Sequence, residues 1–204
     1  MKNLILGVAL MALTVVNPVA GSSVDGVRGD AAEGERLSKV CAGCHGVDGN
    51  SLVPNWPKLA GQGRRYLREQ LAAFKSGVRN NAQMAPMVAG LSEQAMADLA
   101  AYFAGQTVSI GTVDPDHLAA GRQVYQGGDQ PRAVAACMGC HGPSGRGNPA
   151  AGYPALAGQH AAYTVSQLKA FAEGTRRHAM MSPIAANMNQ AQMTAVASYI
   201  EGLY

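Results

Sequence analysis

The chain is poor in aromatic residues and in cysteine, and neither sign of charge dominates it. Phe, Trp and Tyr make up 5 % of its 204 residues, and there are four cysteines. The formal net charge is +3, and basic and acidic residues are nearly equal in number in each half of the chain. No segment therefore forms the basic patch that a nucleic-acid partner requires, and we expect no nucleic acid among the partners.

Long hydrophobic runs are also scarce. The longest lies near the start, where Lys2 precedes a largely apolar stretch over residues 4–16 and small residues follow at 20–23. This stretch is short for a membrane span and has the order of a secretory signal peptide, which we place at residues 1–23. If the signal is not cleaved, it acts as a membrane anchor; in either case the protein is exported.

All four cysteines belong to two C-x-x-C-H pentads. These are Cys41, Cys44 and His45 in the first, and Cys137, Cys140 and His141 in the second. The pattern is typical of c-type haem attachment, in which both thiols add to the haem vinyl groups and the histidine ligates the iron. Two pentads with no cysteine left over predict two covalently bound haem c groups, and a core built around porphyrin needs few aromatic side chains.

Other uses of these cysteines fit the sequence less well. Zinc sites place their second cysteine pair within about 15–20 residues of the first, but 92 residues separate Cys44 from Cys137. A thioredoxin-like motif needs a preceding strand, and the flanking chain is rich in Ala and Gly with no Val/Ile run. Disulfides within each pair leave both histidines unexplained.

An internal repeat runs through the chain. The pentads are offset by 96 residues, and after one inserted residue the run at 57–62 recurs at 154–159. Further pairs follow at the same offset, among them Tyr66 with Tyr163 and Gln70 with Gln167. The repeat predicts two similar domains, at residues 24–106 and 116–204, joined by a linker at 107–115 that lacks helical periodicity.

The hydrophobic periodicity predicts an all-α fold. In the first domain we expect a helix from Asp30 to Val40, one from Arg64 to Ser76 that stops at Gly77, and one that Ser92 caps and that ends near Ala104. The second domain repeats the plan with helices near residues 116–126, 161–173 and 189–202.

A haem iron held by one histidine needs a ligand on its other face. Candidate thioethers are Met84 and Met87 in the first domain, and Met180 and Met181 in the second. Methionine is more often adaptable core packing, but Met84 aligns with Met181 and each precedes an x-Pro pair. We therefore predict Met84 and Met181 as axial ligands, on a loop beyond the second long helix of each domain.

The other ring nitrogen of each ligating histidine needs a hydrogen-bond partner. Pro57 and Pro154 lie 12 and 13 residues after the two pentad histidines, where a carbonyl could accept that bond. The same prolines could instead do no more than shape a turn.

Three histidines have no histidine counterpart in the repeat, and for them we expect a surface or linker role: His117, His160 and His178. Four recurring pairs are candidate partners for the haem propionates, although core packing and, for the arginines, a solvated surface explain them equally well. These pairs are Trp56/Tyr153, Gln62/Gln159, Tyr66/Tyr163 and Arg79/Arg176.

The chain resembles the dihaem cytochrome c4 family over essentially its whole mature length. The resemblance rests on CAGCHGVDGNS at the first pentad, PKLAGQ followed by a tyrosine, and GQHAAYTVSQL in the second half. It implies two tandem class I cytochrome c domains packed face to face about a pseudo-twofold axis. It also implies a monomeric electron carrier of the periplasm, loosely associated with the membrane, that serves respiratory donors and a terminal oxidase. In that arrangement Cys41, Cys44, His45 and Met84 hold one haem, and Cys137, Cys140, His141 and Met181 hold the other.

We therefore predict an electron-transfer protein with two closed His/Met haems and no catalytic residues. One alternative is a dedicated haem subunit of a dehydrogenase. A dihaem peroxidase is a further alternative, but it requires an iron without a methionine ligand.

Overall fold

The computed structural model describes residues 27–204; the predicted signal peptide lies outside the described residues. Within residues 27–204 the chain forms ten α-helices, one 3-10 turn and no β-strand, which confirms the all-α prediction. In order, the elements are α1 (Ala31–Ser38), α2 (Ala42–His45), α3 (Arg64–Lys75), α4 (Met84–Val88), α5 (Glu93–Ala104), α6 (Pro115–Gly127), η1 (Gln130–Arg132), α7 (Met138–His141), α8 (Ala161–Ala172), α9 (Met181–Ala186) and α10 (Gln190–Glu201).

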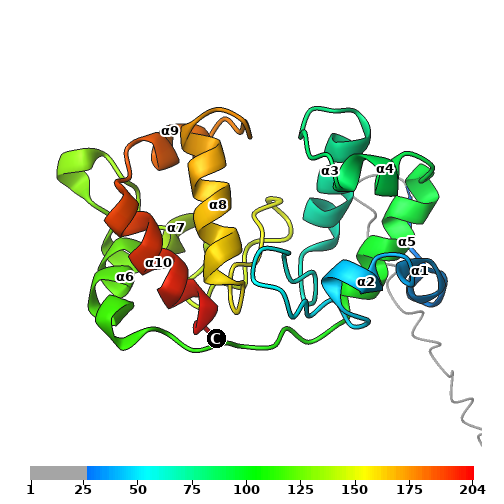
Figure 1. The fold of residues 1–204 in the computed structure, drawn as a ribbon, viewed down its shortest axis with the longest axis horizontal. Coiled ribbons are helices and arrows are strands. Elements are labelled where there is room, and N and C mark those ends of the chain that lie inside the picture. Colours follow the sequence, from blue (N-terminus) through cyan, green and yellow to red (C-terminus); the bar gives the residue numbers. More distant parts are fainter. Residues whose placement is uncertain (1–26) are drawn as a thin grey trace, which may run out of the picture.

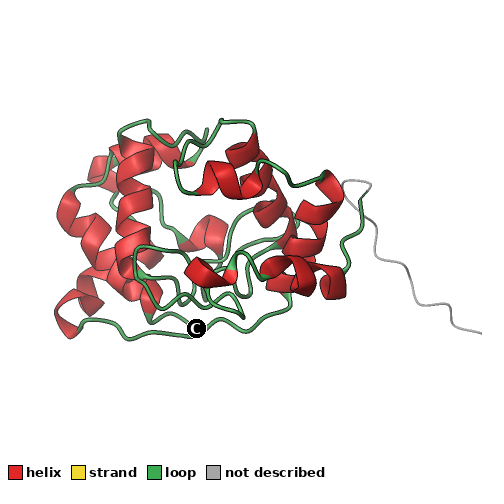
Figure 2. Ribbon diagram, turned by 45° about the vertical axis from the view of Figure 1, so that its right-hand side comes forward, coloured by secondary structure: helices red, strands yellow, loops and turns green. Residues whose placement is uncertain are grey.

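The helices form two halves that lie side by side. Helices α1–α5 make one half and α6–α10 the other, and the segment between α5 and α6 runs along one edge of both (Figure 1). Helix packing stays within each half: α1 packs on α5 and α3 on α5, while α6 packs on α10 and α8 on α10. Loops face each other in the middle of the molecule (Figure 2). The two halves therefore meet through loops and long side chains.

The six longer helices begin and end close to the predicted residues. The side chain of Asp30 accepts a hydrogen bond from the Ala32 N–H, and Ser92 caps α5 in the same way. Asn189 forms a reciprocal capping box with Gln192 at the start of α10. Each cap satisfies a backbone donor that has no partner inside its helix, which is why these residues mark the starts so clearly.

Two short helices differ from the prediction. Met84 and Met181 were expected on loops, but they are the first residues of α4 and α9. The Asn81 side chain accepts from the backbone N–H of Met84 at 2.9 Å, and the Nδ1 atom of His178 accepts from that of Met181 at 3.3 Å. Helices of five and six residues are too short for hydrophobic periodicity to reveal.

The first and last long helices of each half cross at a glycine. A Cβ atom on Gly34 would lie 2.0 Å from the backbone oxygen of Asp98, and one on Gly121 would lie 2.2 Å from that of Ala195. No side chain larger than hydrogen fits at either crossing, so the helix axes can approach closely. The buried cores then form beside these crossings, around Leu99 and Phe103 in the first half and around Val196 and Ile200 in the second.

None of the helices within residues 27–204 combines the length and the apolar character needed to cross a lipid bilayer.

Candidate functional site

One cavity of about 710 Å³ extends through both halves of the molecule and gathers the predicted site residues. Its walls include the four pentad cysteines, both pentad histidines, and the predicted methionines: Cys41, Cys44, His45, Met84, Cys137, Cys140, His141 and Met181. The sequence repeat separates the two sets by almost half the chain, yet the fold brings both to the same cavity.

The two pentad histidines are buried and held in the same way. Nδ1 of His45 lies 2.8 Å from the carbonyl oxygen of Pro57, and Nδ1 of His141 lies 2.9 Å from that of Pro154. A carbonyl oxygen can only accept, so each Nδ1 carries a proton and each Nε2 keeps its lone pair for a metal. Burial lowers the pKa of both imidazoles, with the proline hydrogen bonds acting in the opposite direction. A neutral imidazole with Nε2 free is the form that binds iron.

The cysteines stand on the same turn of chain as the histidines. In the first pentad Cys41 is the residue before α2, and Cys44 and His45 lie within that single helical turn. All four thiols are free, and burial raises the pKa of Cys41 and Cys137, the latter to about 11. Each pentad therefore presents two thiols beside one imidazole. Elsewhere in residues 27–204, side chains of His, Cys, Asp and Glu do not gather in groups of three or more suited to a metal.

Burial distinguishes the methionines. All four candidates line the cavity, but Met87 and Met180 are 44 % and 50 % exposed. Met84 and Met181 are less exposed, and each begins a short helix that packs near the long helix of its half, α3 or α8. The geometry favours the pair that the sequence repeat selected.

The walls around each pentad suit a porphyrin. In the first half they are aliphatic and aromatic, with Leu59, Leu67, Leu71, Phe74 and Phe103, and the second half supplies Leu156, Leu168, Phe171, Val196 and Ile200. Paired thiols, an imidazole with a free lone pair and a thioether form the donor set of a haem c site. Haem c, when bound, supplies an iron that gains and loses one electron.

Two glutamines join the halves reciprocally. Gln62 donates from Nε2 to the carbonyl of Ala155 at 2.9 Å and accepts the Ala155 N–H at 2.8 Å. Gln159 makes the same pair of bonds with the backbone of Lys58, both at 2.9 Å. Positions 58 and 155 correspond in the repeat, so this seam has the pseudo-twofold symmetry that the resemblance to the cytochrome c4 family implies. The side-chain amides of Gln62 and Gln159, which were candidate propionate partners, form most of their hydrogen bonds across the interface.

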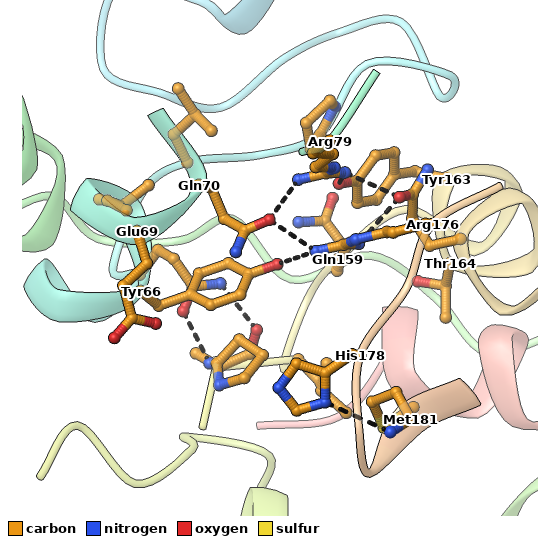
Figure 3. Close-up of a pocket in the computed structure, with 18 of the residues that line it drawn as sticks. Tyr66, Glu69, Gln70, Arg79, Gln159, Tyr163, Thr164, Arg176, His178 and Met181 are labelled. Atoms are coloured by element: carbon orange, nitrogen blue, oxygen red, sulfur yellow. Dashed lines mark hydrogen bonds between the residues drawn. The ribbon is translucent and has the colours of Figure 1, made fainter. Parts of the chain in front are cut away.

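A second reciprocal network surrounds two arginines (Figure 3). Arg79 donates to Gln70 in its own half and, across the interface, to Gln167 and to the hydroxyl of Tyr163. Arg176 mirrors these bonds with the corresponding residues of the opposite half. Each arginine also lies over a phenylalanine ring of its own half, at 4.5 Å to the centroid. The solvated-surface interpretation of these arginines is wrong, because the bridging holds them half-buried between the domains.

The expectation for one histidine was also wrong. His160 is 7 % exposed and lies between the two halves, where its Nε2 is 2.9 Å from the backbone oxygen of Ser51. The side chain of Lys58 is buried close by and donates to the carbonyls of Ser109 and Gly158. Sequence reasoning missed this group because none of these side chains recurs in the repeat. The recurrence of Gln70 as Gln167 could have marked these two residues as functional, but the sequence analysis assigned them no role.

Comparison with known proteins agrees with this geometry. The family model described as Cytochrome c matches twice, over residues 31–106 and 118–203. Cytochrome c4 of Pseudomonas aeruginosa is 47 % identical over 180 residues, which cover 86 % of this chain and 90 % of the relative. The crystal structure of reduced recombinant cytochrome c4 from Pseudomonas stutzeri is 44 % identical and has a TM-score of 0.83, covering 86 % of this chain and 100 % of that one. The thiosulfate dehydrogenase electron acceptor of Stutzerimonas stutzeri is 35 % identical, over 85 % of this chain and 87 % of its own length.

The duplicated pentads, the duplicated family match and the likeness to solved cytochrome c4 all lead to one assignment. The protein has two class I cytochrome c domains, binds two covalent haem c groups and transfers electrons. The chain belongs to the cytochrome c family and, within it, to the dihaem cytochromes c4.

Proposed function

We propose that the protein is a monomeric single-electron carrier of the periplasm, loosely associated with the membrane, that links a respiratory donor to a terminal oxidase and has no substrate chemistry of its own. The observation that carries the proposal is the duplicated pairing of a buried histidine, bonded through Nδ1 to a proline carbonyl, with a methionine on the same cavity. An iron with both axial positions filled exchanges electrons with little rearrangement and leaves no position for a substrate. The apolar segment near the start of the sequence supports export.

The proposed ligand sets are symmetric. His45 and Met84 ligate the first iron, and His141 and Met181 ligate the second. Cys41 and Cys44 tether the first haem, and Cys137 and Cys140 the second. The carbonyls of Pro57 and Pro154 orient the histidines. We propose the corresponding division of the mature chain into domains at residues 24–106 and 116–204, with a linker at 107–115.

An optical redox titration of the purified holoprotein tests this proposal. We expect two one-electron steps at positive potential, together with the weak far-red absorption of methionine bound to ferric iron at an intensity that accounts for both haems. The measurement contradicts the proposal if one haem titrates at a much lower potential and contributes none of that absorption. Peroxide turnover by the same preparation would then point to a dihaem peroxidase.

A second function has specific support: a dedicated electron acceptor of a dehydrogenase. The relative named as a thiosulfate dehydrogenase electron acceptor covers most of this chain. Purification from the native membrane and periplasmic fractions separates the two possibilities. Recovery at fixed stoichiometry with one dehydrogenase supports the dedicated acceptor, whereas recovery as a free monomer supports the general carrier.

A further inference from the structure

The interface between the halves contains a contact that has no symmetric counterpart. His160, the residue before α8, reaches from the second half into the loop that follows the first pentad. Its Nε2 lies 2.9 Å from the backbone oxygen of Ser51 and 3.0 Å from the Ser51 hydroxyl. The repeat places glycines at the two reciprocal positions, Gly63 and Gly147, and glycine has no side chain with which to make the reverse contact.

The contact has a defined direction. The backbone oxygen of Ser51 can only accept, so Nε2 of His160 carries the proton and donates it. The opposite ring nitrogen, Nδ1, lies 3.4 Å from a carboxylate oxygen of Glu201 on α10. His160 is held in the second half by its own backbone, whose carbonyl accepts from the N–H of Thr164 in α8 at 2.9 Å, and its side chain donates to the first half.

Ser51 also bonds to the chain segment that holds the first pentad histidine. Its side chain is buried, and its hydroxyl donates to the carbonyl of Trp56 at 2.6 Å. The next residue is Pro57, whose carbonyl accepts the Nδ1–H of His45 at 2.8 Å. Three hydrogen bonds, His160–Ser51, Ser51–Trp56 and Pro57–His45, and the backbone between Trp56 and Pro57 thus connect His160 with the ring of His45.

The second half fixes its corresponding loop by other means. There the backbone N–H of Gly147 donates to the carbonyl of His141 at 2.8 Å, within the same domain. The histidine–proline geometry is nearly the same in both halves. The other domain contacts the second loop too, since Arg65 donates to the carbonyl of Ala150 at 3.0 Å, but this loop has no counterpart of the bonds that link His160 to Ser51 and Ser51 to Trp56.

We propose that His160 is a positioning residue for the first haem alone: it holds the loop at 51–57 so that the Pro57 carbonyl keeps its bond to His45. This inference rests on the proposed ligation by His45. A strong Nδ1–H bond increases the electron donation of an imidazole to its metal, which favours ferric iron. Loosening the loop weakens that bond, so loss of His160 raises the midpoint potential of the first haem and leaves the second unchanged.

The test is a redox titration of holoprotein variants. His160→Ala removes the donor, His160→Gln restores one, and Ser51→Ala breaks the same connection from the other domain. His117→Ala, at a half-buried histidine of the second half outside this contact, is the matched control. The two midpoints are assigned with Met84→Ala, which lowers that of the first haem. A second measurement is the proton resonance of His45 Nδ1–H in the ferrous protein, which moves upfield as the hydrogen bond weakens.

We expect a higher first midpoint and an upfield His45 resonance in His160→Ala and in Ser51→Ala. We also expect recovery in His160→Gln and no change in His117→Ala. If both midpoints move together, the contact only stabilises the interface and the proposal fails. It fails as well if the first midpoint stays in place in both variants while Met84→Ala still lowers it. If Met84→Ala moves neither midpoint, the ligand assignment itself is wrong and the inference falls with it.

Discussion

The two halves of this cytochrome are alike around their pentad histidines and in the symmetric contacts between them. They differ in the contacts between the halves that have no symmetric counterpart. The histidine–proline hydrogen bonds are 2.8 and 2.9 Å long, and the arginine networks mirror each other bond for bond. In contrast, His160 and Lys58 face residues of the opposite half that offer no mirror image. Similar ligands therefore do not make the two haem sites equivalent, because each site is also held by its neighbour.

The largest expected effect comes from removing the axial thioethers one at a time. Met84→Ala and Met181→Ala should each remove half of the far-red absorption. Each should lower one midpoint potential by on the order of 0.2 V, a fraction of the about 0.8 V range that axial ligands span. Carbon monoxide should then bind the opened ferrous haem.

The exposed neighbours provide the control for this comparison. Met87→Ala and Met180→Ala should leave spectra and potentials unchanged, since both side chains are about half exposed at 44 % and 50 %. Loss of the far-red absorption in either of these variants, with its retention in Met84→Ala or Met181→Ala, would show that the ligand had been misassigned.

The arginine networks test whether the interface is symmetric in energy as well as in geometry. Arg79→Ala and Arg176→Ala should each lower the free energy of unfolding by about 2 kcal/mol, because each removes charged hydrogen bonds to partly buried partners. The two losses should agree within about 0.5 kcal/mol, and the double variant should lose less than their sum because both arginines share Gln70 and Gln167. Urea unfolding of the holoproteins measures this, and strictly additive losses would argue against a shared network.

The side chains that bond to the first turns of α4 and α9, Asn81 and His178, should contribute less to the free energy of unfolding than the arginines do. Asn81→Ala should destabilise the protein by about 1 kcal/mol, the usual effect of losing a helix cap. His178→Ala should cost less, since the bonds from His178 to the backbone are 3.2 and 3.3 Å long, against 3.0 and 2.9 Å for Asn81. His178→Asn should increase the melting temperature. A decrease in that variant would show that the imidazole stabilises the second half in a way that the first half lacks.

The smallest effect concerns the buried amine of Lys58, which corresponds to Ala155. Burial lowers the pKa of Lys58, and the nearby charge of Glu201 partly offsets this. The unfolded chain therefore holds this proton more tightly than the folded protein. Lys58 therefore makes the free energy of unfolding increase as the pH rises from the lowered pKa to the ordinary value of 10.5. Relative to Lys58→Met, the unmodified protein should be more stable at the upper end of that window than at neutral pH, as measured by denaturant unfolding.

Local patterns in the sequence were sufficient for much of the fold. The pentads, the six longer helices and the Ser92 cap depend on residues close together in the chain, and the repeat selected Met84 and Met181 from several methionines. Helices α4 and α9 escaped prediction because each holds barely more than one turn. The position of His160 could not be predicted, because its partner Ser51 is distant in the sequence and neither residue recurs in the other half.

The glutamine seam has a consequence for how firmly the halves must bind. Polar reciprocal contacts of this kind are typical of a homodimer interface, in which one patch meets its own copy. Here residues 105–114 connect the partners, and Asn50 fastens this connection through the carbonyl of Thr107 and the N–H of Ser109. Closure is then an intramolecular event with an effective concentration on the order of millimolar or more, whatever the dilution of the protein. The seam can therefore consist of a few hydrogen bonds and still keep the two haems together in a dilute compartment.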